Sequence, residues 1–307
     1  MANNEDFDNR PTIKTKLSPS SVVFYIIAYL VVGLMAIVCL APFVIMISGS
    51  FTSEQYIAFH GFNIIPKEFT VEAYKIVFKV PEMIARAYGV SILVTIVGTV
   101  AGLFLTSMTA FVLSRQDFKY RYFFSFFFYF TTLFSGGMVC TYIFFIRYLH
   151  LKNSLLSIIF PGMFSVFNLL IMRSFISALP SALVESAKID GASDFRIYIT
   201  IILPLIKSGL ATIGLFMALA YWNDWYNAML YIDKDKLYPL QYMLYNMLQK
   251  QEAMARMAAK TGMVMKDVPS NSLKMAMAVV ATGPILIVYP FVQKYFVKGV
   301  TVGSVKG

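Results

Sequence analysis

Long apolar runs separated by short polar segments dominate the chain. Five runs contain no charged residue, and they cover 17–53, 87–114, 122–146, 153–172 and 275–293. A sixth run, 208–232, contains one charge, Asp224. A helix needs about 20 apolar residues to cross a bilayer. One acid at mid-bilayer costs about 3 kcal/mol, which the many Leu, Ile, Phe and Val residues of the run offset. The pattern therefore predicts an all-α integral membrane protein with six spans.

These runs also set the expected boundaries. Residues 1–21 are polar and predict a tail, 22–298 a transmembrane domain, and 299–307 a second tail. The six helices are expected at 22–49, 88–113, 122–146, 153–178, 205–231 and 275–296. The second helix repeats the small residues Gly98, Gly102 and Ala110, a face that allows close helix contact. The first run is too long for a secretory signal, so it predicts an anchor that is not cleaved.

The longest polar-patterned segment between two spans whose pattern still predicts helix is 180–204, which we call the elbow. Pro180 suits a first helical turn, and Asp190-Gly191 predicts a helix stop with glycine at positive φ. Ser193 or Asp194 can then cap a second helix. Two short helices joined by a sharp turn are therefore expected.

Two features of the elbow bear on its use. Four apolar residues of the second helix recur at three- and four-residue spacing and predict one stripe: Phe195, Tyr198, Ile199 and Ile202. Small side chains gather near the turn, at Ser186, Ala187, Gly191 and Ala192, and would let another protein approach the backbone. From the pattern alone, an amphipathic helix lying on the membrane surface explains the stripe equally well.

Three strings in the elbow carry a resemblance. Glu185-Ser186-Ala187, Asp190-Gly191-Ala192 and Ile202-Leu203-Pro204 resemble the EAA loop of bacterial ATP-binding-cassette (ABC) importer permeases, E-A-A-x-x-D-G-A followed by I-x-L-P. The resemblance implies a type I importer permease whose cytoplasmic coupling helices sit in a cleft of an ATPase and transmit its closure. It assigns this role to Glu185, Ser186, Ala187, Lys188, Asp190, Gly191 and Ala192. Ser186 and Ser208 depart from the pattern, and both are small.

Composition excludes a water-soluble globule. Hydrophobic residues make up 58% of the chain and charged residues 14%, and the mean hydropathy is +0.68, whereas soluble domains carry about 25% charge. The net charge of +10 comes from lysines and arginines at span ends, where lipid headgroups are the ordinary partners, so nucleic-acid binding is excluded. Basic residues divide equally between the two sides, so the cytoplasmic N-terminus rests on the resemblance. Cys39 and Cys140 are expected to be buried packing residues.

No catalytic motif appears in the sequence. It lacks the G-x-x-x-x-G-K-[ST] loop that cradles nucleotide phosphates, as well as H-E-x-x-H, G-x-S-x-G and C-x-x-C. His60 and His150 lie in different predicted loops and are expected to be ordinary surface residues. We therefore expect a non-catalytic subunit that binds no metal or cofactor, with ATP and Mg²⁺ held by a partner ATPase.

An aromatic and amide string at the end of the fifth predicted helix is the candidate substrate path. Aromatic rings stack on the apolar faces of sugars, and amides pair with hydroxyls. The candidates are Tyr221, Trp222, Asn223, Asp224, Trp225 and Asn227, with Asn168 on the fourth helix. An aromatic belt at the outer interface, with Asp224 reaching water, is the alternative explanation. The W-N-D-W string resembles the fifth-helix segment of sugar-importer permeases, where these positions border the path.

The C-terminal third extends the resemblance. The segments 272–278, 290–299 and 303–307 resemble carbohydrate-uptake permeases of the maltose-transporter type, within them the LplC-like subgroup of Gram-positive bacteria. The resemblance covers the chain from about residue 20. It implies a second homologous permease, two ATPase subunits, and an extracellular lipoprotein that delivers the sugar. A permease for a non-sugar solute is the alternative, followed by a stand-alone transporter or scaffold.

Overall fold

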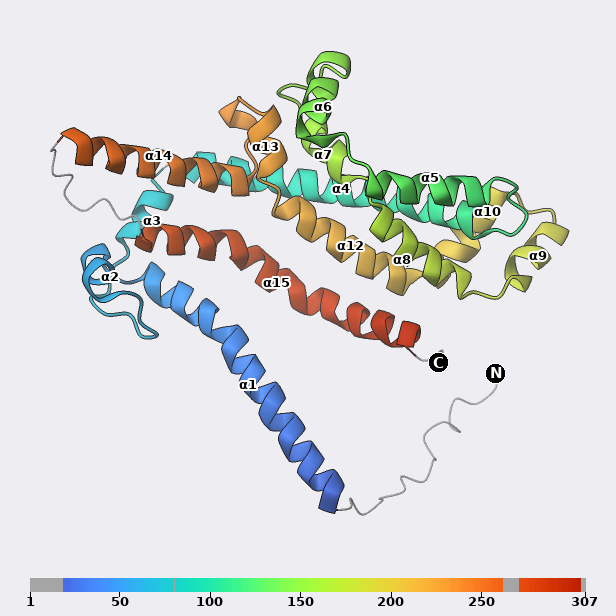
Figure 1. Cartoon of the computed structure of the whole chain (residues 1–307), viewed down its shortest axis with the longest axis horizontal. Coiled ribbons are helices and arrows are strands. Elements are labelled where there is room, and N and C mark those ends of the chain that lie inside the picture. The colour runs from blue at the N-terminus through green and yellow to red at the C-terminus, as the bar shows by residue number, and fades with distance from the viewer. Residues whose placement is uncertain (1–18, 80, 262–270, 305–307) are drawn as a thin grey trace.

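The computed structural model describes residues 19–79, 81–261 and 271–304, and these residues form helices joined by short loops. The only extended pairing among them is an isolated bridge between Thr52 and Phe69. The molecule is elongated, with α4 (Pro81–Ser114), α12 (Lys207–Trp222) and α15 (Asn271–Ser304) running along its length (Figure 1). The predicted all-α fold is confirmed. The predicted tails fall in part on residues 1–18 and 305–307, which lie outside the described residues.

Two helices are long and apolar enough to cross a membrane unbroken, α1 (Pro19–Ser50) and α4. Three further candidates are bent pairs: α5 (Arg121–Leu133) with α6 (Gly137–Ile143) and η1 (Phe144–Tyr148), bent by 112°; α7 (Leu156–Gly162) with α8 (Val166–Ser177), bent by 54°; and α10 (Asp194–Ile197), η2 (Tyr198–Ile202) and α11 (Leu203–Leu205) with α12, bent by 84°. The described apolar part of α15, Asn271–Ile287, is a shorter segment of the same character.

Two helices expected to be continuous are interrupted. The expected helix 122–146 breaks after Leu133, where Gly137 adopts a φ of +75°, a conformation that favours glycine. The expected helix 205–231 stops at Trp222 and restarts as α13 (Tyr226–Tyr231). Asp224 explains this break because its carboxylate accepts hydrogen bonds from the backbone N and the side-chain Nδ2 of Asn227, at 3.0 and 2.8 Å. The acid caps a new helix and does not lie within a continuous span.

Glycines bring α4 close to α12 and to the end of α7. A Cβ atom added to Gly98 would lie 2.4 Å from the ring of Tyr221, and one added to Gly102 would lie 2.8 Å from the carbonyl oxygen of Met163. Ala110, further along the same helix, is fully buried. The small-residue face expected in this helix is therefore confirmed, and it is the surface on which the bundle is built.

Two apolar clusters hold the bundle. The first joins α3 (Glu72–Val77), the N-terminal half of α4, α7, α12, α14 (Leu240–Thr261) and α15. The second joins the C-terminal half of α4, α8, α9 (Ala182–Ile189), α10, η2 and the start of α12. Helix α14, together with η3 (Asp235–Leu237), occupies the polar stretch after the fifth predicted span, where no helix was expected. α2 (Glu54–His60) completes the described helices.

Much apolar surface remains uncovered by this subunit. In α1 only Ser48, Gly49 and Ser50 are buried, and Figure 1 shows this helix diverging from the bundle. No residue of α5 is buried. Cys39 and Cys140 are exposed, so the expectation that they pack inside is wrong. An apolar side chain on a membrane helix can face lipid or another subunit at no cost, and an apolar sequence run therefore does not imply burial.

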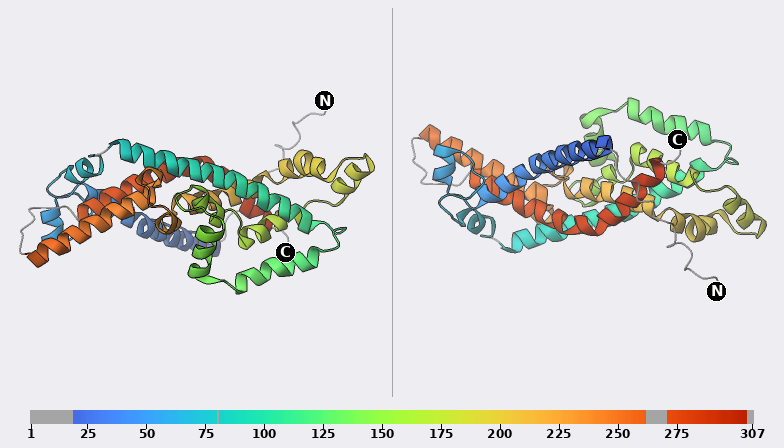
Figure 2. Two further views of the ribbon diagram at one scale, coloured as in Figure 1. Left: turned by 90° about the horizontal axis from the view of Figure 1, so that it is seen from above. Right: turned by 90° about the horizontal axis from the view of Figure 1, so that it is seen from below.

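The elbow lies at one end of the elongated molecule, with α2 and α3 at the other (Figures 1 and 2). At the α2 end, the carboxylate of Glu54 accepts hydrogen bonds from the backbone N of Asn271 at 3.0 Å and of Ser272 at 2.9 Å. This contact fixes the start of α15 against α2. The long axis of the bundle therefore runs between the elbow and this clamp.

Candidate functional site

The elbow turns sharply after α9 because its last carbonyls are closed by backbone hydrogen bonds. Gly191 N donates to Lys188 O at 3.0 Å, and Ala192 N donates to Ala187 O at 2.9 Å. These two bonds, with Gly191 at a φ of +76°, form the Schellman arrangement that ends many helices. The predicted glycine stop is confirmed. The turn is set by backbone conformation, since an added Cβ at Gly191 would meet no atom within 4 Å.

The second limb of the elbow begins at Ser193, as expected. Its hydroxyl accepts a hydrogen bond from Arg196 N at 3.4 Å and caps α10. The predicted apolar stripe is only half correct: Tyr198 and Ile202 are buried, whereas Phe195 and Ile199 are exposed at 61% and 39%. Ile197 takes their place in the core. Phe195 and Ile197 both lie in α10, ahead of the π-helix η2, so the packing of α10 against the second cluster selects the buried side there.

Tyr198 anchors this limb to α4. It is 1% exposed, and its hydroxyl shares a hydrogen bond of 2.7 Å with the hydroxyl of Ser107. Its ring contacts Phe104 and Phe111, with centroids 6.2 and 5.8 Å apart. The base of the elbow is therefore packed into the second apolar cluster, in contact with α4.

The seven residues assigned to coupling are not equally accessible. Glu185, Ser186, Lys188, Asp190 and Gly191 are exposed, and Ala192 is half-buried. Ala187 is buried at 8% exposure and packs in the second cluster, so the small face expected around the turn is closed at this position. Its role is to seat α9 on the bundle.

Two large apolar residues protrude from the elbow: Phe195, which belongs to the predicted stripe, and Ile189, which the sequence pattern did not single out. Ile189 is 86% exposed and Phe195 is 61% exposed. Ile189 lies between two of the residues assigned to coupling. In the sequence, an isoleucine beside the polar turn was the feature that could have indicated an exposed contact residue. Large apolar groups exposed on a polar segment are typical of a surface that another protein covers.

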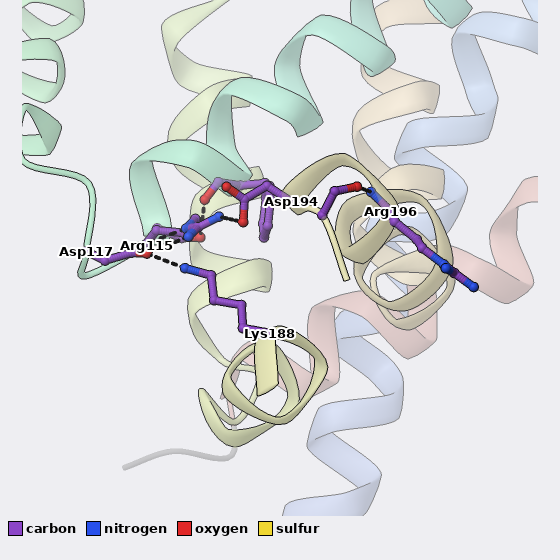
Figure 3. A network of polar contacts seen from close by, with 8 residues as sticks. Arg115, Asp117, Lys188, Asp194 and Arg196 are labelled. Carbon is purple, nitrogen blue, oxygen red and sulfur yellow. Dashed lines mark hydrogen bonds and ion pairs between the residues drawn. The ribbon is translucent and has the colours of Figure 1, made fainter. Parts of the chain in front are cut away.

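Four charged side chains tie the elbow to the loop after α4. Arg115 donates to both carboxylate oxygens of Asp117, from Nε at 2.8 Å and from Nη2 at 2.5 Å. Asp117 also accepts from Lys188 of α9 at 2.5 Å, and Arg115 forms an ion pair with Asp194 of α10. Figure 3 shows these groups converging, while Arg196 points away. We call Arg115, Asp117, Lys188 and Asp194 the ion network.

The network is electrostatically matched. Hydrogen bonds from Arg115, and then from Lys188, hold the pKa of Asp117 well below its usual range. The hydrogen bond to Asp117 raises the pKa of Arg115. The Arg115 side chain is 13% exposed while Asp117 and Asp194 are 54% and 61% exposed, so the arginine is the protected centre of the network. Both limbs of the elbow are thereby linked to one loop.

The aromatic and amide string is arranged differently from the elbow. Tyr221 is buried, and its hydroxyl donates to Ile159 O at 2.6 Å. Trp222 is also buried, and its Nε1 donates to Ala281 O at 3.1 Å. The polar atoms of both side chains are therefore engaged with α7 and α15 inside the subunit.

The remaining candidates for the path lie nearer the surface. Asn223 is exposed, donates to Leu219 O at 2.9 Å and accepts from Gln241 at 3.4 Å. Trp225 is 37% exposed and stacks on Tyr245 with centroids 4.5 Å apart. Asp224 and Asn227 bond each other. Asn168 is buried in α8, and no hydrogen bond within the described ranges connects it to this string.

The positions of the histidines and acids bear on metal binding. His60 is exposed and stacks on Tyr56 at 4.6 Å, and His150 is exposed in a turn with a φ of +51°. Among residues 19–79, 81–261 and 271–304, no group of three or more His, Cys, Asp or Glu side chains could hold a metal ion.

Comparison with known proteins gives consistent matches along nearly the whole chain. The family described as "Binding-protein-dependent transport system inner membrane component" matches residues 12–302. Protein LplC of Bacillus subtilis (strain 168) is 40% identical over 287 residues, which cover 93% of this chain and 95% of LplC. The polygalacturonan/rhamnogalacturonan transport system permease protein YtcP of the same organism is 38% identical over 285 residues, covering 93% and 99%.

One solved structure has the same fold. A chain in the crystal structure of a bacterial ABC transporter involved in the import of the acidic polysaccharide alginate matches with a TM-score of 0.76 and 28% sequence identity. The match covers 91% of this chain and 98% of that chain. The resemblance to LplC-like permeases and the type I permease fold are thereby confirmed.

Proposed function

Because the chain belongs to the family of binding-protein-dependent transport system inner membrane components, we propose that it is the membrane subunit of an ATP-driven carbohydrate importer. In this proposal the elbow docks on a cytoplasmic ATPase. The exposed Ile189 and Phe195 carry the proposal, because they provide a contact surface on an elbow whose second limb is packed into α4.

The proposed working cycle follows from these connections. ATP and Mg²⁺ are bound by two separate ATPase subunits, and this chain contributes no catalytic residue. ATP binding closes the ATPases, and the closure displaces the elbow. The ion network and Tyr198 pass that displacement to α4, and the path opens outward. The N-terminus and the elbow then lie on the cytoplasmic side.

The substrate is proposed to be an oligosaccharide delivered by an extracellular lipoprotein. Two observations support it: the names of YtcP and of the solved importer both refer to polysaccharides, and Asn223 and Trp225 offer an accessible amide and ring. A second homologous permease would complete the path and cover the exposed face of α1. Uptake of labelled pectin and alginate oligosaccharides, against amino acids and phosphate, tests the class of solute.

Replacing Gly191 tests the docking role. A valine at a φ of +76° costs on the order of 1–3 kcal/mol, so the turn should be distorted. Asparagine tolerates this conformation and is the matched variant. Gly191→Val should assemble in the membrane yet lose ATP-driven uptake and substrate-stimulated ATPase activity. Gly33→Ala, at an open position of α1, should behave as wild type.

The asparagine variant separates two causes. Normal uptake by Gly191→Asn would assign the loss to the backbone, whereas loss with asparagine too would indicate that the partner approaches the turn closely. Normal uptake by Gly191→Val would refute the docking role.

A further inference from the structure

A cavity of about 490 Å³ lies between the inner face of α9 and the ends of α4, α5 and α8. Its volume falls within the range of ordinary ligand sites, about 300–1,000 Å³. Six charged residues line it: Arg115, Arg121, Arg173, Lys188, Asp117 and Glu185. Four of these are basic and two acidic, so the lining carries an excess of positive charge. Phe111, Ile176 and Ile202 supply an apolar floor.

Two of the four cations lack an acidic partner. Arg115 and Lys188 pair with Asp117 and Asp194, but neither Arg121 nor Arg173 has a carboxylate within 4.0 Å in the part of the chain that the structure describes. Both are half-buried. A partly desolvated arginine without a counter-ion is unfavourable. The described side chains therefore leave the positive charges of Arg121 and Arg173 without a neutralising carboxylate.

The two arginines are held in place. Arg173 Nη1 donates to Ser125 Oγ at 3.1 Å, and Ser125 Oγ donates to Arg121 O at 2.6 Å. The Arg121 guanidinium lies 4.5 Å from the centre of the Tyr122 ring and donates to its hydroxyl at 2.6 Å. Positioned arginine forks match the geometry of phosphate oxygens.

The surface next to the cavity is strongly apolar. Helix α5 leads away from Arg121 with Tyr122, Phe123 and Phe126 exposed at 72%, 64% and 65%. An anion that carries long apolar chains would satisfy both surfaces at once. A soluble phosphate would leave the α5 face unused.

We propose that this cavity binds the phosphate headgroup of an anionic phospholipid, with its acyl chains lying along α5. Arg121 and Arg173 contact the phosphate. The bound lipid packs against the inner face of α9 and so connects the elbow to the membrane. The proposal goes beyond the transport function; only the leaflet, the cytoplasmic one, rests on the proposed orientation of the elbow.

Native mass spectrometry of the assembled transporter tests the proposal. Complexes are reconstituted in nanodiscs containing phosphatidylcholine with phosphatidylglycerol, then released, and retained lipids are counted. Arg121→Gln/Arg173→Gln is compared with Lys119→Gln, which removes a charge from the same loop outside the cavity. The double variant removes both guanidinium groups that contact the phosphate, whereas Lys119→Gln leaves them in place. The double variant should therefore retain phosphatidylglycerol roughly tenfold less well or worse.

Each possible result either supports or overturns the proposed phospholipid site. Phosphatidylglycerol retained by wild type and Lys119→Gln but lost from the double variant supports the site. Equal retention by all three, or equal retention of phosphatidylcholine by wild type, overturns it. Inorganic phosphate that displaces the lipid at millimolar concentration identifies a soluble anion instead. Cross-links from position 173 to the ATPase that replace bound lipid assign the cavity to that protein. Ser125→Ala, which frees Arg173, serves if the double variant does not assemble, and it should lower retention in the same direction.

Discussion

The elbow and the 221–227 segment both interrupt an apolar chain with polar residues, but they differ in where their binding groups point. In the elbow, the base is buried through Ala187 and Tyr198 while Ile189 is 86% exposed. In the 221–227 segment, Tyr221 and Trp222 are buried and bond to α7 and α15. A polar string can thus serve as a contact surface or as an internal joint, and only the direction of the side chains separates the two.

Helix α4 connects the elbow to the 221–227 segment. Tyr221 packs on Gly98 of α4, and Tyr198 packs against Phe104 and Phe111 of the same helix. The 34-residue helix α4 therefore touches both regions along its length. In the proposed transport cycle it is the element that passes movement from the elbow to the path.

We expect the largest effect at Trp222. It separates the structural role of a buried residue of the 221–227 segment from the role of an exposed one. Trp222→Ala removes a buried ring and the donor to Ala281 O, which costs about 3–5 kcal/mol by analogy with other core truncations. The complex should lose thermal stability and yield. Asn223→Ala, its exposed neighbour, should assemble normally and change substrate-stimulated ATPase activity.

Thermal inactivation of purified complexes measures the first effect, and ATPase assays with and without substrate measure the second. A stable, fully assembled Trp222→Ala complex would show that the ring is not a structural joint. An Asn223→Ala complex with unchanged stimulation would favour the outer aromatic belt.

The next largest effect is expected at Ile189. Burying an isoleucine contributes about 1.5–3 kcal/mol, so Ile189→Asp should weaken ATPase docking by at least roughly tenfold without altering the fold, because the side chain is exposed. Ile64→Asp is the control, since Ile64 is 68% exposed at the α2 end of the molecule. Co-purification of the ATPase with tagged permease measures docking, and equal losses in both variants would contradict the assignment.

A smaller effect is expected from the ion network. Asp117→Asn removes the acceptor shared by Arg115 and Lys188, and exposed ion pairs of this kind contribute about 1 kcal/mol. Uptake should fall by roughly fivefold or less. Lys152→Met, which breaks the ion pair with Asp233 away from the elbow, should change uptake less. Equal effects in the two variants would mean that the network does not transmit movement.

The ion network also predicts how uptake depends on pH. Because the pKa of Asp117 is lowered in the folded protein, its contribution is present above the ordinary aspartate pKa of about 3.9 and is lost only as pH falls through the lowered value. Uptake between pH 5 and 8 should therefore show no step that Asp117→Asn abolishes. Such a step would contradict the pairing.

The sequence was informative where local chemistry decides the structure. Gly191 at positive φ, the Ser193 cap and the close face at Gly98 and Gly102 follow from properties of single residues and short spacing. The family resemblance lay in the elbow strings, and the match to residues 12–302 confirms it.

Sequence reasoning was less successful where tertiary packing decides. Packing against the second cluster buries Ile197 of α10 in place of Phe195, and no spacing rule anticipated it. Asp224 was read as a charge tolerated in a span, whereas it caps a separate helix. Cys39 and Cys140 face outward because a membrane subunit has no need to hide apolar side chains from lipid.

The central claim is that the elbow contacts an ATPase inside the cell, and cross-linking from Ile189→Cys tests it most directly. Cys39 and Cys140 are exposed and are first replaced by alanine to remove competing thiols. In inside-out vesicles of the assembled transporter, a short bifunctional maleimide should join position 189 to the ATPase subunit, and an impermeant maleimide added to intact cells should leave it unlabelled. Labelling from outside, or no adduct with a nucleotide-hydrolysing subunit, would contradict the account.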